Sequence, residues 1–275
     1  MNRYLVQLSD PHIKAPGLLA YGRVDTAAYL ARAVAAVNAL PQPADAVVVT
    51  GDLTDFGRAD EYAHLRMLLD GLRCPVYLMP GNHDDRAGLR AGFADHAYLQ
   101  GACDLVQYAV DLGGLRLIAA DTVVPGASHG SLLPDRIADL DRMLGEKPNL
   151  PSIVAMHHPP FRTLIGHMDE IGLCTGAEDL AAVIGRHPRV ERVICGHLHR
   201  SIQVRWAGTI AMCAPSTAHQ VALDLSINAP SAFVLEPPGF LVHAWDESGA
   251  VVTHLKPVGD FAGPFPFHQD GALID

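Results

Sequence analysis

The 275-residue sequence is poor in cysteine and in basic residues. Its cysteines are odd in number and none forms a Cys-x-x-Cys pair, so we expect reduced thiols rather than a disulfide framework or a thiolate zinc site; they are Cys74, Cys103, Cys174, Cys195 and Cys213. The 20 Lys and Arg against 30 Asp and Glu give a formal net charge of −10, and no run of five basic residues occurs. This composition excludes a protein that wraps nucleic acid, so we expect no nucleic-acid polymer as a partner.

Long apolar runs are also missing. None approaches the roughly 18–20 residues that cross a bilayer, and Asp10 interrupts the first segment before the apolar core of a signal peptide could form. We therefore expect no membrane partner and a cytoplasmic location. With 49% hydrophobic and 18% charged residues, the composition is that of a globular protein. The length suits one large domain, or a core with a small appendage.

Short apolar runs alternate with stretches of helical spacing over most of the chain. This alternation predicts an α/β layered core, because buried strands read as short apolar runs and surface helices repeat apolar residues every three or four positions. The expected strands are Tyr4–Leu8, Ala46–Thr50, Val76–Met79, Leu115–Ala120, Ser152–Met156 and Arg192–Cys195. The expected helices are Thr26–Leu40, Asp60–Leu72, Asp135–Leu144 and Glu178–Arg186.

The pattern changes after His199. Ile202–Trp206 and Thr209–Cys213 flank Ala207-Gly208, which indicates a hairpin, and helical spacing fades from Pro215 onward. We therefore predict a core over residues 1–199, a small β-rich segment over residues 200–255, and a C-terminal tail over residues 256–275 that packs on the core.

Polar residues gather where the predicted strands end, and many of the 15 histidines are among them. The five blocks read Asp10-Pro11-His12, Gly51-Asp52-Leu53-Thr54-Asp55, Gly81-Asn82-His83-Asp84, His157-His158-Pro159-Pro160 and Gly196-His197-Leu198-His199. Open α/β sheets place ligand sites beyond the carboxyl ends of their strands, and histidine is the commonest metal ligand. Each block alone is ordinary turn or capping chemistry. Five unrelated turns would rarely all carry residue types that bind metals, so the set predicts a metal site.

This ordered set resembles the motifs of the calcineurin-like metallophosphoesterases: D-x-H, G-D-x-x-D, G-N-H-D, a histidine after the fourth strand, and G-H-x-H. Within that family the chain looks most like the bacterial glycerophosphodiesterases and class III cyclic-nucleotide phosphodiesterases. Further segments that carry this likeness are Leu19-Ala20-Tyr21-Gly22, residues 56–62, His219-Gln220-Val221 and Ala262-Gly263-Pro264. The resemblance implies a four-layer αββα sandwich for the catalytic core, with residues 200–255 as a cap and dimerisation segment.

Position by position, the resemblance implies two metal ions. The first would be held by Asp10, His12, Asp52 and His199, and the second by Asp52, Asn82, His157 and His197, with Asp52 bridging. Imidazole and carboxylate ligands without thiolate suit two divalent or mixed-valence transition-metal ions, of iron, manganese, cobalt or zinc. We expect the second ion to bind more weakly, because its only carboxylate is shared and Asn82 is neutral.

The resemblance also implies roles around the metals. Asp52 and His83 would be catalytic: a hydroxide bridging the metals attacks phosphorus, and His83 stabilises the developing charge or protonates the leaving alkoxide. Substrate would also contact Asn82, His158 and His219, although a structural role for His158 is as plausible. Asp55 and Asp84 would orient ligands or cap turns. The other histidines are expected at the surface or in packing; they are His64, His96, His129, His167, His187, His243, His254 and His268.

The charge balance favours a small phosphodiester. Two divalent ions, less Asp10, Asp52 and one hydroxide, leave about +1 in the site, which a monoanionic diester would neutralise. We therefore expect hydrolysis of 3′,5′-cyclic nucleotides, of glycerophosphodiesters, or of both. One alternative is a phosphomonoesterase, which would need more positively charged side chains near the metals than Arg86 alone. The other is a metal-free scaffold, which would be expected to have lost metal ligands.

The segment Ser226–Trp245 is rich in large apolar residues and carries few charges. Pro237 and Pro238 interrupt it, so it cannot be one long helix. A core hairpin would explain it, but a 56-residue appendage is small to bury that much apolar surface. We therefore predict a homodimer or larger homo-oligomer through residues 200–255, with Phe240 and Leu241 at the interface.

Overall fold

The computed structural model describes residues 2–101 and 104–274, and its core consists of two mixed β-sheets. The five-stranded sheet has the order β15-β14-β1-β2-β3, with β1 Arg3–Leu8, β2 Ala46–Thr50, β3 Val76–Met79, β14 Gly239–Trp245 and β15 Val251–Pro257. The six-stranded sheet has the order β10-β11-β9-β7-β5-β4, with β4 Tyr108–Asp111, β5 Arg116–Ala120, β7 Ser152–Met156, β9 Val190–Cys195, β10 Ile202–Trp206 and β11 Thr209–Cys213. In the five-stranded sheet β1, β2 and β3 are parallel, and β14 pairs antiparallel with both β1 and β15. In the six-stranded sheet β5, β7, β9 and β11 are parallel, and the edge strands β4 and β10 pair antiparallel.

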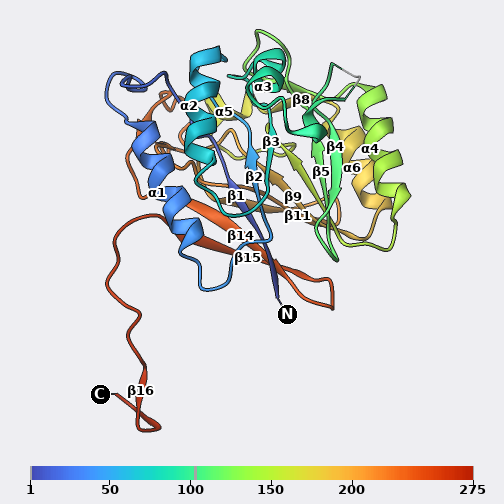
Figure 1. The fold of residues 1–275 in the computed structure, drawn as a ribbon. Coiled ribbons are helices and arrows are strands. Elements are labelled where there is room, and N and C mark those ends of the chain that lie inside the picture. Colours follow the sequence, from blue (N-terminus) through green and yellow to red (C-terminus); the bar gives the residue numbers. More distant parts are fainter. Residues whose placement is uncertain (1, 102–103, 275) are drawn as a thin grey trace.

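Helices cover the outer faces of the two sheets (Figure 1). Those beside the first sheet are α1 Thr26–Asn38 and α2 Ala59–Leu69, and those beside the second are α4 Pro134–Glu146 and α6 Ala177–Arg186. The shorter elements are α3 Arg86–Gly92, η1 Ala97–Leu99, β6 Gly130–Ser131, α5 Gly166–Asp169, β8 Leu173–Thr175, β12 Gln220–Val221, β13 Phe233–Val234, β16 His268–Gln269 and β17 Ala272–Leu273. The expected four-layer αββα arrangement is confirmed.

Local sequence explains why these elements form where they do. All five residues of β2 are buried, as expected for a β-branched run at the centre of a parallel sheet. The Asp25 carboxylate accepts a hydrogen bond from the Ala28 N–H at 3.0 Å and caps α1. Pro134 begins α4, which turns Ile137, Leu140 and Leu144 inward. Apolar side chains from both sheets and their helices then form one continuous core.

The predicted boundary at residue 199 is wrong. The hairpin of β10 and β11 extends the six-stranded sheet beyond β9, and β14 pairs with β1 at the heart of the five-stranded sheet. Phe240 and Leu241 lie in β14 and are 0% and 2% exposed, so they belong to the core and not to an interface. The apolar surface that appeared too large for a small appendage is buried between the sheets instead.

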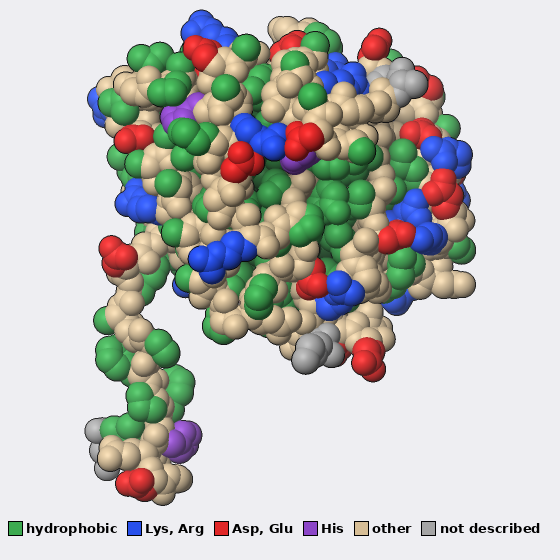
Figure 2. All heavy atoms as spheres, in the orientation of Figure 1, with side chains coloured by type: hydrophobic (Ala, Val, Ile, Leu, Met, Phe, Trp, Pro, Cys, Tyr) green, Lys and Arg blue, Asp and Glu red, His purple; other side chains and the backbone are tan. Residues whose placement is uncertain are grey.

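The C-terminal tail does not pack on the core. Residues 259–274 are exposed, and the segment stands clear of the body (Figures 1 and 2). The Val258 N–H still donates to the Pro238 carbonyl at 2.8 Å, and beyond it the Ile274 N–H donates to Phe267 inside the tail itself, at 3.0 Å. Frequent glycine and proline disfavour a regular element that could lie against a sheet.

Two further sequence expectations concern cysteine and the membrane. Cys74, Cys174, Cys195 and Cys213 are free thiols, and Cys103 lies outside the described residues. Among the helices of residues 2–101 and 104–274, none is long and apolar enough to cross a bilayer.

Candidate active site and metal centre

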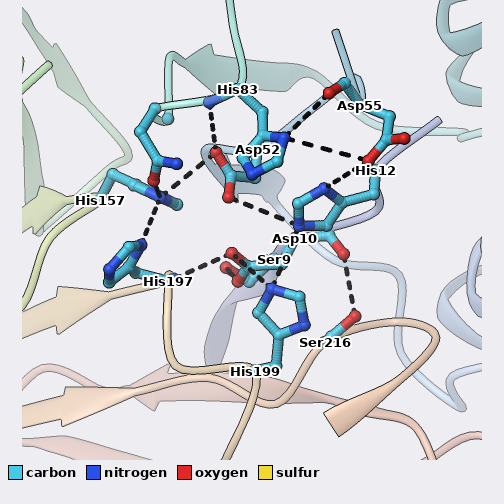
Figure 3. A network of polar contacts seen from close by, with 12 residues as sticks. Ser9, Asp10, His12, Asp52, Asp55, His83, His157, His197, His199 and Ser216 are labelled. Carbon is cyan, nitrogen blue, oxygen red and sulfur yellow. Dashed lines mark hydrogen bonds and ion pairs between the residues drawn. The ribbon is translucent and has the colours of Figure 1, made fainter. Parts of the chain in front are cut away.

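The five polar blocks converge at the carboxyl ends of β1, β2, β3, β7 and β9 (Figure 3). Hydrogen bonds tie the blocks of the two sheets together. The His197 N–H donates to Asp10 Oδ1 at 2.9 Å, across the two sheets, and the His83 N–H donates to Asp52 Oδ1 at 3.0 Å. The sequence prediction that these strand ends form one constellation is thus met by the geometry.

Several of these residues hold an unusual backbone conformation. Asp10, His12, Asp52, His197 and His199 all have positive φ values, between 44° and 67°. The left-handed region is costly for non-glycine residues and persists only where the surroundings enforce it. Backbone hydrogen bonds provide that support, for example from His12 N–H to the Asp52 carbonyl at 2.9 Å. Such clustered strain is characteristic of functional sites.

Glycines allow the strand ends to approach one another closely. A Cβ at Gly81 would lie 2.2 Å from Asp52 Oδ1, and a Cβ at Gly196 would lie 2.4 Å from the Thr50 carbonyl oxygen. Any side chain at either position would push a candidate ligand out of place.

A first cluster of ligand atoms comprises Asp10, His12, Asp52 and His199, whose donor atoms all lie within 4.8 Å of one another. The Nε2 atoms of His12 and His199 are 3.1 Å apart. His12 Nε2 lies 3.4 Å from Asp52 Oδ2, and His199 Nε2 lies 3.5 Å from Asp10 Oδ1. Four donor atoms thus face one point, as a metal ion requires.

A second cluster lies on the other side of Asp52. His157 Nε2 is 3.0 Å from Asn82 Oδ1, 3.3 Å from His197 Nδ1 and 3.4 Å from Asp52 Oδ1. Asp52 therefore directs Oδ2 toward the first cluster and Oδ1 toward the second. This is the geometry that the predicted bridging ligand needs.

The remaining ring nitrogens fix how the imidazoles are presented. His157 Nδ1 donates to the Thr50 carbonyl at 2.9 Å and His199 Nδ1 donates to the His219 carbonyl at 3.1 Å. These contacts place the proton on Nδ1 and leave the Nε2 lone pair directed into the site. Metal-binding histidines are usually held in this way.

The electrostatics of the site also fit cations. Burial opposes the charge on Asp52, but the His157 imidazolium outweighs it and holds the Asp52 pKa well below its usual range. Burial likewise opposes the charge on His157, and the Asp52 carboxylate overcomes this and raises its pKa to about 9. Burial raises the pKa of Asp10 to about 6, and burial together with the His12 charge lowers the pKa of His199 to about 3.

These pKa shifts arise because buried carboxylates and imidazoles lie close together and share protons. Buried His197 Nε2 also has no hydrogen-bond partner among the described residues. Divalent cations would replace the protons and neutralise the carboxylates. With nitrogen and oxygen donors and no thiolate, the residues fit two transition-metal ions.

Asp55 and Asp84 hold the ligand loops from outside. Asp55 Oδ1 lies 3.3 Å from His12 Nδ1, and its other oxygen accepts from Lys14 Nζ at 3.0 Å. Asp84 accepts hydrogen bonds from the N–H groups of Leu53 and Gly81, both at 2.9 Å. Asp55 thereby orients a ligand ring directly, whereas Asp84 fixes the loops that carry Asp52 and Asn82.

A cavity of about 400 Å³ opens above the two clusters. Its lining includes Asn82, His83 and His219, three of the four predicted substrate-contacting residues. The fourth, His158, is buried beside the site and hydrogen-bonds Thr122 Oγ1 through Nδ1 at 2.8 Å and the Ser128 carbonyl through Nε2 at 3.2 Å. Both of its nitrogens are occupied and it does not line the cavity. This geometry favours the structural alternative for His158, and its contact with substrate stays a prediction.

Sequence analysis missed other residues that line the cavity, namely Tyr21, Ser128, His167, Met168, Ile171, Val221, Ser231, Ala232 and Phe233. The segment Leu19-Ala20-Tyr21-Gly22 carried part of the family resemblance and could have pointed to Tyr21. His167 lies in α5, a helix of four residues, which is too short to show helical periodicity.

Comparison with known proteins agrees with this geometry. Residues 4–201 match the model of the family "Calcineurin-like phosphoesterase". The chain is 37% identical over 272 residues to "Probable glycerophosphodiester phosphodiesterase GpdQ" of Arcobacter nitrofigilis, covering 98% of this chain and 99% of that protein. It is 34% identical over 272 residues to a "Probable cyclic nucleotide phosphodiesterase" of Rhodopseudomonas palustris, covering 98% and 97%.

Among solved structures, a dimetal phosphatase from Danio rerio shares the fold, with a TM-score of 0.63 at 16% identity. The match covers 94% of this chain and 99% of that chain. The family match spans all five strand-end blocks, which the structure brings together as two ligand clusters joined by Asp52. The chain therefore belongs to the calcineurin-like phosphoesterase family and is a metal-dependent phosphoesterase with a dimetal site.

Proposed function

We propose that this protein is a phosphodiesterase that hydrolyses small monoanionic diesters, either 3′,5′-cyclic nucleotides or glycerophosphodiesters. The observation that carries the proposal is Asp52, which turns one oxygen to each ligand cluster at the floor of a cavity. Among the described residues, no lysine or arginine lines this cavity. The two curated relatives named above, a glycerophosphodiesterase and a cyclic nucleotide phosphodiesterase by name, support the same class of substrate.

Seven residues would hold the metals: Asp10, His12, Asp52 and His199 at one position, and Asp52, Asn82, His157 and His197 at the other. When bound, two such ions supply a hydroxide nucleophile near neutral pH and neutralise charge on the phosphoryl oxygens. We infer that iron, manganese, cobalt or zinc fills these positions, since the donors are imidazole, carboxylate and amide.

His83 is placed to act on the leaving group. It lines the cavity, and its ring lies edge-on to the His12 ring with centroids 4.7 Å apart. Its Nδ1 donates to the Asp55 carbonyl at 2.9 Å, so Nε2 carries a proton only when the ring is cationic. The Asp55 carboxylate oxygen lies 4.0 Å from Nδ1. His83 can therefore give its Nε2 proton to a departing alkoxide.

The charges of the cavity disfavour a phosphomonoesterase. A dianionic monoester would gain from a lysine or arginine beside the metals, and none lines the cavity among the described residues. Arg86, the nearest in sequence to the Gly81–Asp84 block, is bound to the Asp121 carboxylate at 2.7 Å and to the Val123 carbonyl at 2.8 Å. The metal-free scaffold is disfavoured as well, because all seven proposed ligands are present and converge.

The test compares turnover of cyclic AMP, glycerophosphocholine and p-nitrophenyl phosphate by the metal-loaded enzyme. We expect at least one diester to exceed the monoester in kcat/KM, and chelation followed by metal addition to abolish and restore that activity. Preference for the monoester, or activity that persists in the stripped protein, would contradict the proposal.

Replacing Asn82 by alanine should weaken only the second metal position. Asn82 supplies a neutral oxygen 3.0 Å from His157 Nε2, which belongs to the second cluster. Loss of that oxygen should raise the metal concentration for half-maximal activity by roughly 10-fold or more, because even a hydrogen-bond partner of a ligand costs 10–100-fold. Metal titration of the stripped Asn82→Ala variant tests this, with exposed Asn149→Ala as control. An unchanged activation curve counts against Asn82 as a ligand.

We also propose that the protein forms a homodimer or larger homo-oligomer. Since Phe240 and Leu241 are buried, the contact must use other apolar residues, and we assign it to the tail, which carries apolar side chains (Figure 2). In that tail, Phe265 and Phe267 are 75% and 81% exposed. A tail that stands clear of its own body can reach the body of a second copy.

The variant carrying both Phe265→Ser and Phe267→Ser should therefore be smaller in solution than the native protein. Light scattering at micromolar concentration measures this, and Met67→Ser, at an exposed position of α2, is the control. A native monomer, or an oligomer unaffected by the double substitution, rules out the tail as the contact.

A further inference from the structure

The cavity extends beyond the metal ligands along a wall of aromatic rings. The rings of Tyr21 and Phe233 lie 4.9 Å apart and are inclined by only 32°, so they are partly stacked. The His219 ring stands edge-on to both, 5.2 Å from each centroid. His219 also lies 4.6 Å from the His199 ring, which joins this wall to the first metal cluster. A group that leaves the metals along this side meets aromatic surface.

A second part of the lining comes from α5, which contributes His167 and Met168, and from the following Ile171. Both ring nitrogens of His167 are buried, and neither has a hydrogen-bond partner among the described residues. The same holds for Nδ1 of His219. Unpaired buried nitrogens are rare and costly. Two imidazoles facing the same cavity thus indicate a ligand with hydrogen-bonding groups at its edge.

The lining limits the chemistry of that ligand. The described lining has no lysine or arginine, so a second phosphate or a carboxylate would find no counter-ion away from the metals. The hydroxyl groups of a polyol could pair with the imidazole nitrogens, but a polyol has no flat apolar face to lie against the aromatic wall. A trimethylammonium group could lie against aromatic rings, but it could not pair with the nitrogens of His167. A planar heteroaromatic ring satisfies both the aromatic wall and the imidazoles.

We propose that this part of the cavity is a base-binding subsite: Tyr21 and Phe233 pack against a nucleobase, and His167 hydrogen-bonds its edge. The substrate class is then 3′,5′-cyclic nucleotides rather than glycerophosphodiesters. This inference rests on the proposed phosphodiesterase function and narrows it. His167, expected from the sequence to be a surface or packing residue, becomes a specificity-determining residue.

The kinetic test compares His167→Ala and Phe233→Leu with the native enzyme, on cyclic AMP and on glycerophosphoethanolamine. Stacking of a base on an aromatic side chain is worth enough to change affinity by about tenfold or more. We expect Phe233→Leu to raise KM for cyclic AMP by about that factor, and His167→Ala to raise it by roughly fivefold through the loss of a hydrogen bond, with kcat and the parameters for the glycerol diester little changed. His167→Gln, which keeps hydrogen-bonding groups, should recover part of the loss. His254→Ala, exposed on β15, is the control.

An experiment on the native protein avoids any question of folding. Adenosine carries the base without the phosphate, so it should bind and should inhibit hydrolysis of p-nitrophenyl phosphodiesters competitively, and choline should not. Equal changes in KM for both substrates in the variants, or inhibition by choline and not by adenosine, would overturn the subsite. If the proposed phosphodiesterase function is wrong, the native enzyme will hydrolyse no diester with any metal. Calorimetric titration with adenosine would still test the base-binding subsite in that case.

Discussion

Asp52→Ala should remove both metals and nearly all activity. The carboxylate is 3% exposed and faces both clusters, through Oδ2 to His12 and through Oδ1 to His157. Its loss leaves each ion one ligand short and takes a negative charge from both positions. We expect metal affinity to fall by more than the roughly 10–100-fold that follows loss of a ligand's hydrogen-bond partner. Elemental analysis after dialysis, together with turnover at saturating diester, measures both effects.

The Asp52→Asn variant removes the charge of the side chain but keeps its shape. The amide keeps the volume of the side chain, and its oxygen can still accept the His83 N–H that Asp52 Oδ1 accepts at 3.0 Å. Since the charge is lost, both ions should still be bound poorly although the loop around His83 is retained. Asp60→Asn, at the start of α2 and outside the site, is the control. One tightly held metal together with full activity in Asp52→Ala would show that the carboxylate does not bridge.

The strands that carry the site could be predicted from the sequence because their signals are local. The buried run Ala46–Thr50 is a strand with the same bounds in the structure, and Ser152–Met156 is another. Each ends in a polar block, and the carboxyl ends of parallel strands must lie at one edge of a sheet. Convergence of Asp52 with Asn82, and of His157 with His197, follows from that topology without any knowledge of distances, because β2 and β3 share one sheet and β7 and β9 share the other. That Asp52 also meets His157 depends on how the two sheets pack on each other.

The assignment of residues 200–255 failed because strand pairing is non-local. Nothing within Gly239–Trp245 shows that it inserts beside β1, more than 230 residues earlier in the chain, where Tyr4 pairs with Ala244. Its apolar residues were therefore counted as exposed surface, although they form the centre of a sheet. The prediction for the tail failed for the opposite reason: its phenylalanines indicate burial, but Phe265 and Phe267 are 75% and 81% exposed.

His158 and His167 show that residue type alone does not identify the role of a histidine. His157 and His158 are adjacent, so their side chains point in different directions along an extended segment. His157 turns Nε2 toward Asp52, while His158 turns away to Thr122 and Ser128. His167 has no neighbouring motif and reaches the cavity only because the short α5 is folded against it. Position in a motif identifies metal ligands, whereas substrate contacts depend on loops that carry no such signal.

His83→Ala should leave both metals bound and reduce kcat by roughly 10²–10⁴-fold, the usual contribution of general acid–base catalysis. His83 lies beside the first cluster without being part of it, since its Nδ1 is taken by the Asp55 carbonyl at 2.9 Å and its side chain is 36% exposed to the cavity and solvent. The loss should be greatest for diesters with poor leaving groups, because an alkoxide must be protonated as it departs. A p-nitrophenolate leaves without that help, so bis(p-nitrophenyl) phosphate should lose much less. Comparison of kcat for cyclic AMP and this diester, with metal content measured on the same samples and His254→Ala as the control, tests the assignment. Equal losses on the two substrates would make His83 a group that stabilises charge in the transition state and not a proton donor.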